Sequence, residues 1–184
     1  MSKKAILFLT NGFEEAEALV TADVLRRGGV DLTIASVTGE LTVTGSRDIK
    51  IITDTLFENE IENDYDAIIL PGGPGTVNYF ENENLMSYIK KLSENKDILL
   101  AAICAAPGVF GALGLLRNKR ATCYPGHENK LTGAILSENP YETDGNIITG
   151  RSAGCVFDFA FAVLGYICGD EVSKKIRAAM IYQH

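Results

Sequence analysis

Segments typical of buried strands alternate with segments typical of amphipathic helices along almost the whole chain. Short apolar runs predict strands at 4–9, 30–37, 65–73, 98–103, 120–124 and 146–150. Helical spacing of apolar residues predicts helices at 12–29, 84–95, 106–116, 152–169 and 170–182. Such alternation predicts an α/β fold with a mostly parallel sheet and helices on both faces.

One segment departs from this alternation. In residues 39–53, GELTVTGSRDIKIIT, strand-like alternation of side chains is broken by glycine turns. This pattern predicts a small antiparallel excursion. No linker, low-complexity run or repeat interrupts the chain. Its 184 residues fit a single domain, 1–184, with enough chain for a sizeable core.

Charge and hydropathy exclude several classes of partner. The formal net charge of −7 argues against nucleic acid and anionic membranes, because both need clustered positive charge. No apolar stretch reaches the ~20 residues of a membrane helix, and the longest, 156–168, contains Asp158. The run at 4–9 is short for a signal peptide, and acidic residues follow it. We therefore expect a cytoplasmic protein.

Three strand-to-helix turns have a distinctive composition. They are TNGFEEAE at 10–17, LPGGPGT at 70–76 and AICAAPG at 102–108. In parallel α/β folds, ligands bind beyond the carboxyl ends of the strands. We expect these turns to meet at one sheet edge and to form the functional site.

Cys104 lies where an apolar strand gives way to a helix with Pro107 in its first turn. This predicts a sharp turn resembling a nucleophile elbow, although the G-x-S-x-G motif is absent. The small neighbours Ala105 and Ala106 leave room for a substrate. Free N–H groups at a helix start stabilise a thiolate, so we expect the pKa of Cys104 to be lowered. The alternative is an inert buried cysteine.

Glu17 is the one carboxylate on a helix face that otherwise carries Phe13, Val20 and Val24. A carboxyl group facing the core should have a raised pKa. Protonated, it can donate a hydrogen bond to a thiolate, and ionised, it can act as a base. The alternative is that its side chain bends out to water.

The glycines of LPGGPGT can bring backbone N–H groups close to a bound oxygen. Gly72 and Gly73 are the candidates for this anion nest. The lysine and Ser/Thr of a phosphate loop are missing, and no G-x-G-x-x-G appears, so we expect no nucleotide cofactor.

The remaining cysteines predict no metal site. Cys123, Cys155 and Cys168 form no C-x-x-C pair with one another or with Cys104. Cys155 and Cys168 lie in the apolar run 152–169, where we expect small core residues. Cys123 is expected to be structural, the alternative being a redox partner of Cys104.

Several segments together resemble the ThiJ/PfpI superfamily, in particular its parkinsonism-associated deglycase branch and the bacterial relatives of that branch. They are NGFEEAEAL, DVLRRGG, SRDIKI, ILPGGPG, AAICAAPGVF and GRSAG. The resemblance implies a flavodoxin-like three-layer sandwich, a homodimer, and a reactive, readily oxidised cysteine beside a protonated glutamate. It assigns these two roles to Cys104 and Glu17.

The resemblance also implies accessory residues. The oxyanion site falls on Gly72 and Gly73, helped by the N–H of Ala105, and Arg27 and Arg47 match arginines near the pocket and dimer contact. The family often has a histidine before a proline beside the thiol. Here that position is Tyr124, and His127 follows three residues later. Losing the histidine fits a slower enzyme and a redox sensor equally well.

Two functions follow from the same residues. The first is a cofactor-free glyoxalase or deglycase acting on methylglyoxal, glyoxal or early glycation adducts. The second is a redox-sensing or chaperone-like stress protein that uses Cys104 without significant turnover. A flavin or small-molecule binding module rests on fold analogy alone.

Overall fold

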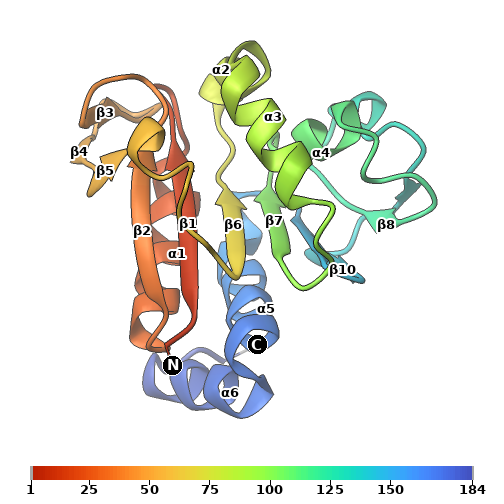
Figure 1. Cartoon of the computed structure of the whole chain (residues 1–184). Coiled ribbons are helices and arrows are strands. Elements are labelled where there is room, and N and C mark those ends of the chain that lie inside the picture. Colours follow the sequence, from red (N-terminus) through yellow and green to blue (C-terminus); the bar gives the residue numbers. More distant parts are fainter. Residues whose placement is uncertain (1, 184) are drawn as a thin grey trace.

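The computed structural model describes residues 2–183, which form a central sheet with helices on both faces (Figure 1). Within that range the sheet has the strand order β10-β11-β7-β6-β1-β2-β5. These strands are β1 (Lys4–Leu9), β2 (Asp31–Ser36), β5 (Thr55–Leu56), β6 (Ala67–Leu70), β7 (Leu99–Ile103), β10 (Tyr141–Asp144) and β11 (Ile147–Gly150). Every neighbouring pair is parallel except β10 with β11, which confirms the predicted mostly parallel α/β fold.

Two groups of helices cover the two faces of the sheet (Figure 1). One face carries α1 (Glu15–Arg27) and α5 (Val156–Cys168), with α6 (Asp170–Ala179) against α5. The other carries α2 (Val77–Glu81), α3 (Glu83–Leu92) and α4 (Pro107–Ala112).

The pleat of each strand divides the core between these faces. In β1, Ala5, Leu7 and Leu9 join the cluster under α1 and α5, whereas Ile6 and Phe8 join the cluster under α3 and α4. Both sets are buried, which is why the central strands appear in the sequence as continuous apolar runs.

Local signals set the helix ends. Asn82 caps α3, because its side chain accepts the backbone N–H of Leu85 at 2.9 Å. After α1, the backbone N–H of Val30 donates to the carbonyl of Leu25, and Gly29 has a positive φ of 82°. The predicted helix 106–116 is shortened to α4, since Gly114 turns the chain with a φ of 72°.

Short elements lie outside the central sheet. The predicted antiparallel excursion is confirmed as the pair β3 (Thr42–Thr44) and β4 (Lys50–Ile52). The predicted strand 120–124 is reduced to β8 (Arg120–Ala121), which pairs with β9 (Ile135–Leu136) instead of joining the central sheet. Single turns of 3₁₀ helix are η1 (Phe57–Asn59), η2 (Pro74–Thr76), η3 (Glu128–Lys130) and η4 (Ala153–Cys155).

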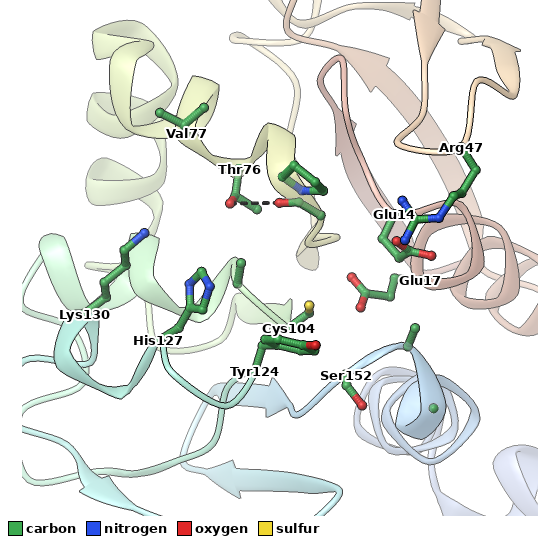
Figure 2. A pocket seen from close by; sticks show the side chains of 15 residues that line it. Glu14, Glu17, Arg47, Thr76, Val77, Cys104, Tyr124, His127, Lys130 and Ser152 are labelled. Atoms are coloured by element: carbon green, nitrogen blue, oxygen red, sulfur yellow. Dashed lines mark hydrogen bonds between the residues drawn. The ribbon is translucent and has the colours of Figure 1, made fainter.

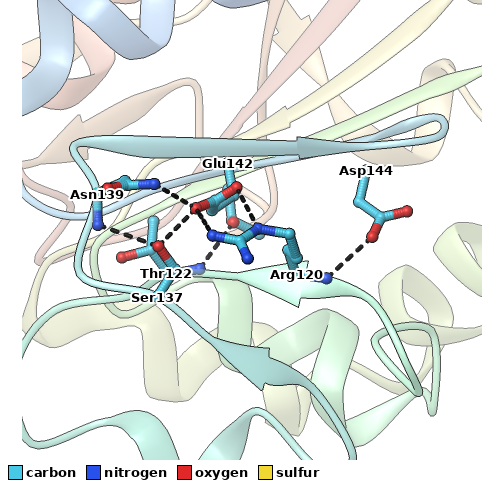
Figure 3. A network of polar contacts seen from close by, with 7 residues as sticks. Arg120, Thr122, Ser137, Asn139, Glu142 and Asp144 are labelled. Atoms are coloured by element: carbon cyan, nitrogen blue, oxygen red, sulfur yellow. Dashed lines mark hydrogen bonds and ion pairs between the residues drawn. The ribbon is translucent and has the colours of Figure 1, made fainter.

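A buried carboxylate fastens the loop between α4 and β10 to the sheet (Figure 3). Glu142 in β10 is 8% exposed. It accepts hydrogen bonds from Arg120 at 3.0 and 3.2 Å, from Ser137 at 2.5 Å and from Asn139 at 2.6 Å. Asp144 accepts the backbone N–H of Arg120 at 2.9 Å. Full pairing of a buried charge favours a single loop conformation.

The chain reverses its direction across the sheet between β1 and β6. From β1 it proceeds to β2 and β5 on one side, and then from β6 to β7 and β11 on the other. The gap beyond the carboxyl ends at such a switch point is where α/β sheets bind ligands. Among residues 2–183, no helix has both the length and the apolar character needed to cross a bilayer.

Candidate functional site

A cavity of about 580 Å³ opens at the carboxyl ends of β1, β6 and β7 (Figure 2). All three of the distinctive turns contribute to its wall, as the sequence predicts. The lining includes Glu14, Glu17, Arg47, Gly73, Thr76, Val77, Cys104, Ala105, Tyr124, His127, Lys130 and Ser152.

Cys104 forms the sharp turn between β7 and α4. Its φ is +66°, a left-handed conformation that costs a non-glycine residue about 1 kcal/mol or more. Two backbone hydrogen bonds hold it there. Its own N–H donates to the carbonyl of Gly150 at 2.9 Å, and its carbonyl accepts the N–H of Tyr124 at 2.8 Å. The predicted strand-to-helix turn at this cysteine is confirmed.

Glu17 points from α1 into the cavity floor, toward the sulfur of Cys104 (Figure 2). Glu17 is only 1% exposed, so the alternative that its side chain bends out to water is wrong. Oε2 accepts the backbone N–H of Gly72 at 2.8 Å. Oε1 is buried and has no partner at standard hydrogen-bond geometry among residues 2–183, but the thiol of Cys104 lies close enough to Glu17 to interact with its carboxyl group.

Burial raises the pKa of Glu17 to about 7, as the sequence predicts in direction. The hydrogen bonds from Cys104 and from Gly72 oppose this shift, and the charge of Glu14 adds to it. A carboxyl group with this pKa exchanges its proton near neutral pH, which suits a general acid or base.

The expected lowering of the pKa of Cys104 is wrong. Burial, followed by the charge and hydrogen bond of Glu17, raises the pKa of the thiol above its usual value. The N–H groups of Gly73 and Ala105 act in the opposite direction but are outweighed. The amides at the helix start therefore do not keep the sulfur ionised. The sulfur can become a thiolate when the carboxylate of Glu17 takes its proton.

In the glycine turn after β6, the backbone N–H groups have partners that differ from the predicted ones. The N–H of Gly72 is engaged by Glu17 and is not free for a substrate oxygen. The N–H groups of Gly73 and Ala105 face the sulfur instead. Gly73 has a φ of +103°, which only glycine adopts readily. The predicted oxyanion role therefore stays available to Gly73 and Ala105.

Three of the four predicted accessory residues line the cavity, and the fourth does not. Tyr124 and His127 line the cavity from the loop after β8, with ring centroids 6.1 Å apart at near-perpendicular planes. Arg47 also lines it. Arg27 is not in the cavity wall, so the expectation that it lies near the pocket is wrong, whereas its place at a dimer contact stays a prediction. It ends α1 and pairs with Asp23, and a helix of this length spans ~20 Å from the cavity end.

The other cysteines differ partly from expectation. Cys123 is buried, and burial raises its pKa to about 11. Cys155 and Cys168 are half-buried and not fully enclosed core residues, because Cys155 precedes α5 in η4 and Cys168 ends the helix.

Sequence reasoning missed Glu14, Lys130 and Ser152 as cavity residues. Each lies in or next to an irregular segment, where no periodicity marks an inward side chain. Within the described part of the chain, no three His, Cys, Asp or Glu side chains are grouped as a metal ion would require.

The shifted pKa of Glu17 makes stability depend on pH in a defined direction. Its pKa is about 7 in the folded protein and 4.5 in the unfolded chain, so the folded state binds more protons between these values. The free energy of unfolding should therefore fall by about 3 kcal/mol from this group as pH rises through that window.

Glu17→Gln removes this titration. Denaturant unfolding at pH 5 and pH 8 should show the variant gaining about 2.5 kcal/mol relative to wild type across that interval. The comparison cancels the carboxylates with lowered pKa values, such as Glu142 and Asp144, which are common to both proteins. A difference between variant and wild type that is independent of pH would contradict the assigned protonation.

Comparison with known proteins gives consistent matches over the chain. The sequence profile of the DJ-1/PfpI family matches residues 3–165. Protein dj-1beta of Drosophila melanogaster is 33% identical over 183 residues, covering 98% of each chain. Its crystal structure superposes with a TM-score of 0.94 at 31% identity, covering 100% of both chains, which confirms the flavodoxin-like fold.

Two further relatives bear on chemistry. Glutathione-independent glyoxalase DJR-1.2 of Caenorhabditis elegans is 30% identical over 178 residues, covering 95% of this chain and 94% of the relative. The structure of oxidized Toxoplasma gondii DJ-1 has a TM-score of 0.94 at 29% identity, covering 100% of both chains.

Proposed function

The chain belongs to the DJ-1/PfpI family, and we propose that it is a cofactor-free, cysteine-dependent glyoxalase or deglycase. Its substrates are methylglyoxal, glyoxal or early glycation adducts. The observation that carries the proposal is the buried carboxyl of Glu17 directed at the Cys104 sulfur in an open cavity. The relative named as a glutathione-independent glyoxalase supports it.

The proposed reaction on methylglyoxal begins at the thiol. Glu17, as carboxylate, takes the proton of Cys104 while the sulfur adds to the aldehyde carbon, forming a C–S bond and a hemithioacetal. The N–H groups of Gly73 and Ala105 are placed to stabilise the oxygen that gains charge.

A proton then moves from the former aldehyde carbon to the neighbouring carbonyl carbon through an enediol. The first carbon is oxidised to a thioester and the second is reduced to an alcohol, so no external oxidant or reductant is needed. Water cleaves the C–S bond of the thioester and releases lactate and the free thiol. Glu17 is the acid and base for these transfers, since its pKa of about 7 allows both roles.

The test is lactate formation by the purified protein from methylglyoxal without glutathione. One molecule of lactate should form for each molecule of methylglyoxal consumed. The absence of lactate would contradict the proposal. The corresponding assay for a deglycase is release of the aldehyde carbons as acid from a freshly glycated amino acid.

A redox-sensing role is the second candidate, because the Cys104 sulfur is reachable from an open cavity and borders backbone N–H groups that can stabilise a sulfinate. The oxidized state named for the Toxoplasma relative supports it. Dilute peroxide should add oxygen at Cys104 before Cys123, which is buried. Peptide mass analysis measures this order, and equal oxidation of all four cysteines would count against the role.

We also propose that the protein is a homodimer in the cytoplasm. In the segment ELTVTG at 40–45, Val43 is fully buried and cannot contribute to a dimer contact. The exposed apolar side chains of this region are Leu41, Ile49 and Ile52, the last 78% exposed on β4. Exposed apolar side chains of this kind are available for an interaction surface. Sedimentation at the mass of one chain would contradict a dimer.

A further inference from the structure

The cavity at Cys104 is much larger than a small aldehyde and continues beyond the sulfur. Its volume of about 580 Å³ lies in the range of pockets that hold drug-sized ligands. Val77 and Lys130 line this cavity and also line an adjoining hollow of about 470 Å³ with Phe80 and Thr132. The two hollows thus share a wall, and a longer molecule could extend from Cys104 toward α2.

His127 presents an unused polar atom on this side of the cavity. Its ring lies between Cys104 and Lys130 (Figure 2). Nδ1 is buried and has no hydrogen-bond partner among residues 2–183. An unpaired buried polar atom is unfavourable, and a ligand that supplies a partner removes that cost.

Lys130 contributes uncompensated positive charge. Within residues 2–183, its ammonium group has no carboxylate at ion-pair distance, and it lies 5.4 Å from the centroid of the Phe80 ring. The neighbouring Glu128 is turned to the N–H of Gly126. Glu81 lines the adjoining hollow but not the cavity at Cys104.

The carboxylates on the opposite wall are already engaged. Glu14 accepts a hydrogen bond from Ser46, and Glu17 accepts one from Gly72. Among residues 2–183, no carboxylate therefore pairs with the ammonium group of Lys130, and its charge is available to a ligand.

Backbone hydrogen bonds link the loop that carries His127 to the backbone of Cys104. The N–H of His127 donates to the carbonyl of Tyr124 at 3.1 Å, and the N–H of Tyr124 donates to the carbonyl of Cys104 at 2.8 Å. A group bound at His127 and Lys130 is thereby placed relative to the reacting atom.

We propose that His127 and Lys130 form a subsite for the anionic end of a substrate, a carboxylate or a phosphate, whose aldehyde carbon reaches Cys104. Nδ1–H and the ammonium group donate charge-assisted hydrogen bonds to it. The preferred substrates are then aldehydes or glycation adducts that carry an anionic tail. This inference deepens the proposed function and relies on Cys104 as the reacting group.

The first test uses two alkylating agents with the same reactive carbon. N-iodoacetyl-β-alanine ends in a carboxylate, and its amide ends in a carboxamide, so only the tail differs. Both form a C–S bond with Cys104 and release iodide. In wild type, the carboxylate reagent should alkylate Cys104 roughly tenfold faster than the amide.

Lys130→Gln should bring the ratio of these two rates close to one. Lys91→Gln is the matched control, because it removes the same charge from an exposed position on α3 that lines neither the cavity nor the adjoining hollow. His127→Phe should lower the ratio, and His127→Asn, whose amide nitrogen can occupy the place of Nδ1, should restore it. A ratio near one in wild type, or a ratio unchanged by both Lys130→Gln and His127→Phe, would overturn the subsite.

A second measurement does not depend on the reactivity of Cys104. The chain has only two histidines, so the imidazole signals of His127 can be followed by NMR. The unreactive N-acetyl-β-alanine and inorganic phosphate should shift these signals in a saturable way, and N-acetyl-β-alanine amide should not. Saturation by only one anion identifies which tail the subsite takes.

No shift with either anion would overturn the subsite even if methylglyoxal is turned over. Conversely, saturable shifts in a protein that makes no lactate would leave the anion subsite standing and contradict the proposed function.

Discussion

Cys104→Ser should reduce lactate formation from methylglyoxal by at least about 10³-fold. A serine hydroxyl is a poorer nucleophile than a thiol, and its proton is far harder for a carboxylate of pKa about 7 to remove. The substitution is nearly isosteric and keeps the backbone hydrogen bonds of residue 104, so the fold should be retained. Initial rates of lactate release without glutathione provide the measurement.

The matched control is Cys168→Ser. Cys168 is half-buried at the end of α5 and is absent from the cavity wall, so this variant should keep wild-type turnover. Equal rates in wild type and Cys104→Ser would contradict a covalent role for the sulfur. An inactive wild type whose Cys104 is selectively oxidised would favour the redox role.

Gly72→Ala should have the second largest effect, on both stability and turnover. A Cβ at this position would lie 2.6 Å from the Cβ of Cys104, 2.7 Å from Oε2 of Glu17 and 2.8 Å from the carbonyl oxygen of Ile103. Real side chains do not approach this closely, so the sulfur, the carboxyl or the end of β7 must move. Overpacking of this kind lowers the free energy of unfolding by about 1–3 kcal/mol.

Turnover by Gly72→Ala should fall more than its stability loss explains, because the pair of groups proposed to share a proton is pushed apart. Denaturant unfolding and lactate formation at a temperature where the variant is folded separate the two effects. Gly154 also lines the cavity, so Gly154→Ala is a control for stability alone: among residues 2–183, a Cβ there meets only Oγ of Ser152 within 4 Å, at 3.8 Å. If Gly72→Ala retained wild-type stability and rates, the close packing around Glu17 would be refuted.

The raised pKa of Cys104 bears on how such a site works. A thiol in this environment stays protonated in the resting protein. Its reactivity should increase as Glu17 loses its proton near pH 7. The carboxyl group then acts as base in the addition and as acid afterwards. Protection of the thiol at lower pH is a consequence of the same arrangement.

The sequence determined the central layers and the location of the site. Continuous apolar runs at 4–9 and 98–103 identify parallel strands buried on both faces, because such strands have no polar face to alternate. The carboxyl ends of parallel strands lie on one edge, so the three distinctive turns had to meet there. The carboxyl at Glu17 was identifiable because it interrupts an apolar helix face.

Tertiary structure alone decided the electrostatics and the far wall. The pKa of Cys104 depends on how fully the sulfur is buried and on where Glu17 points, and the spacing of residues specifies neither. From the sequence, the N–H of Gly72 was expected to bind a substrate oxygen. Its actual partner, Glu17, is 55 residues earlier in the chain and comes close only after folding, so the sequence pattern could not reveal it. His127 and Lys130 lie at the two ends of the single 3₁₀ turn η3, which is too short to show a periodicity, so the sequence does not mark them as cavity residues. Local patterns encode elements and their order, whereas proximity between loops is a property of the packed sheet.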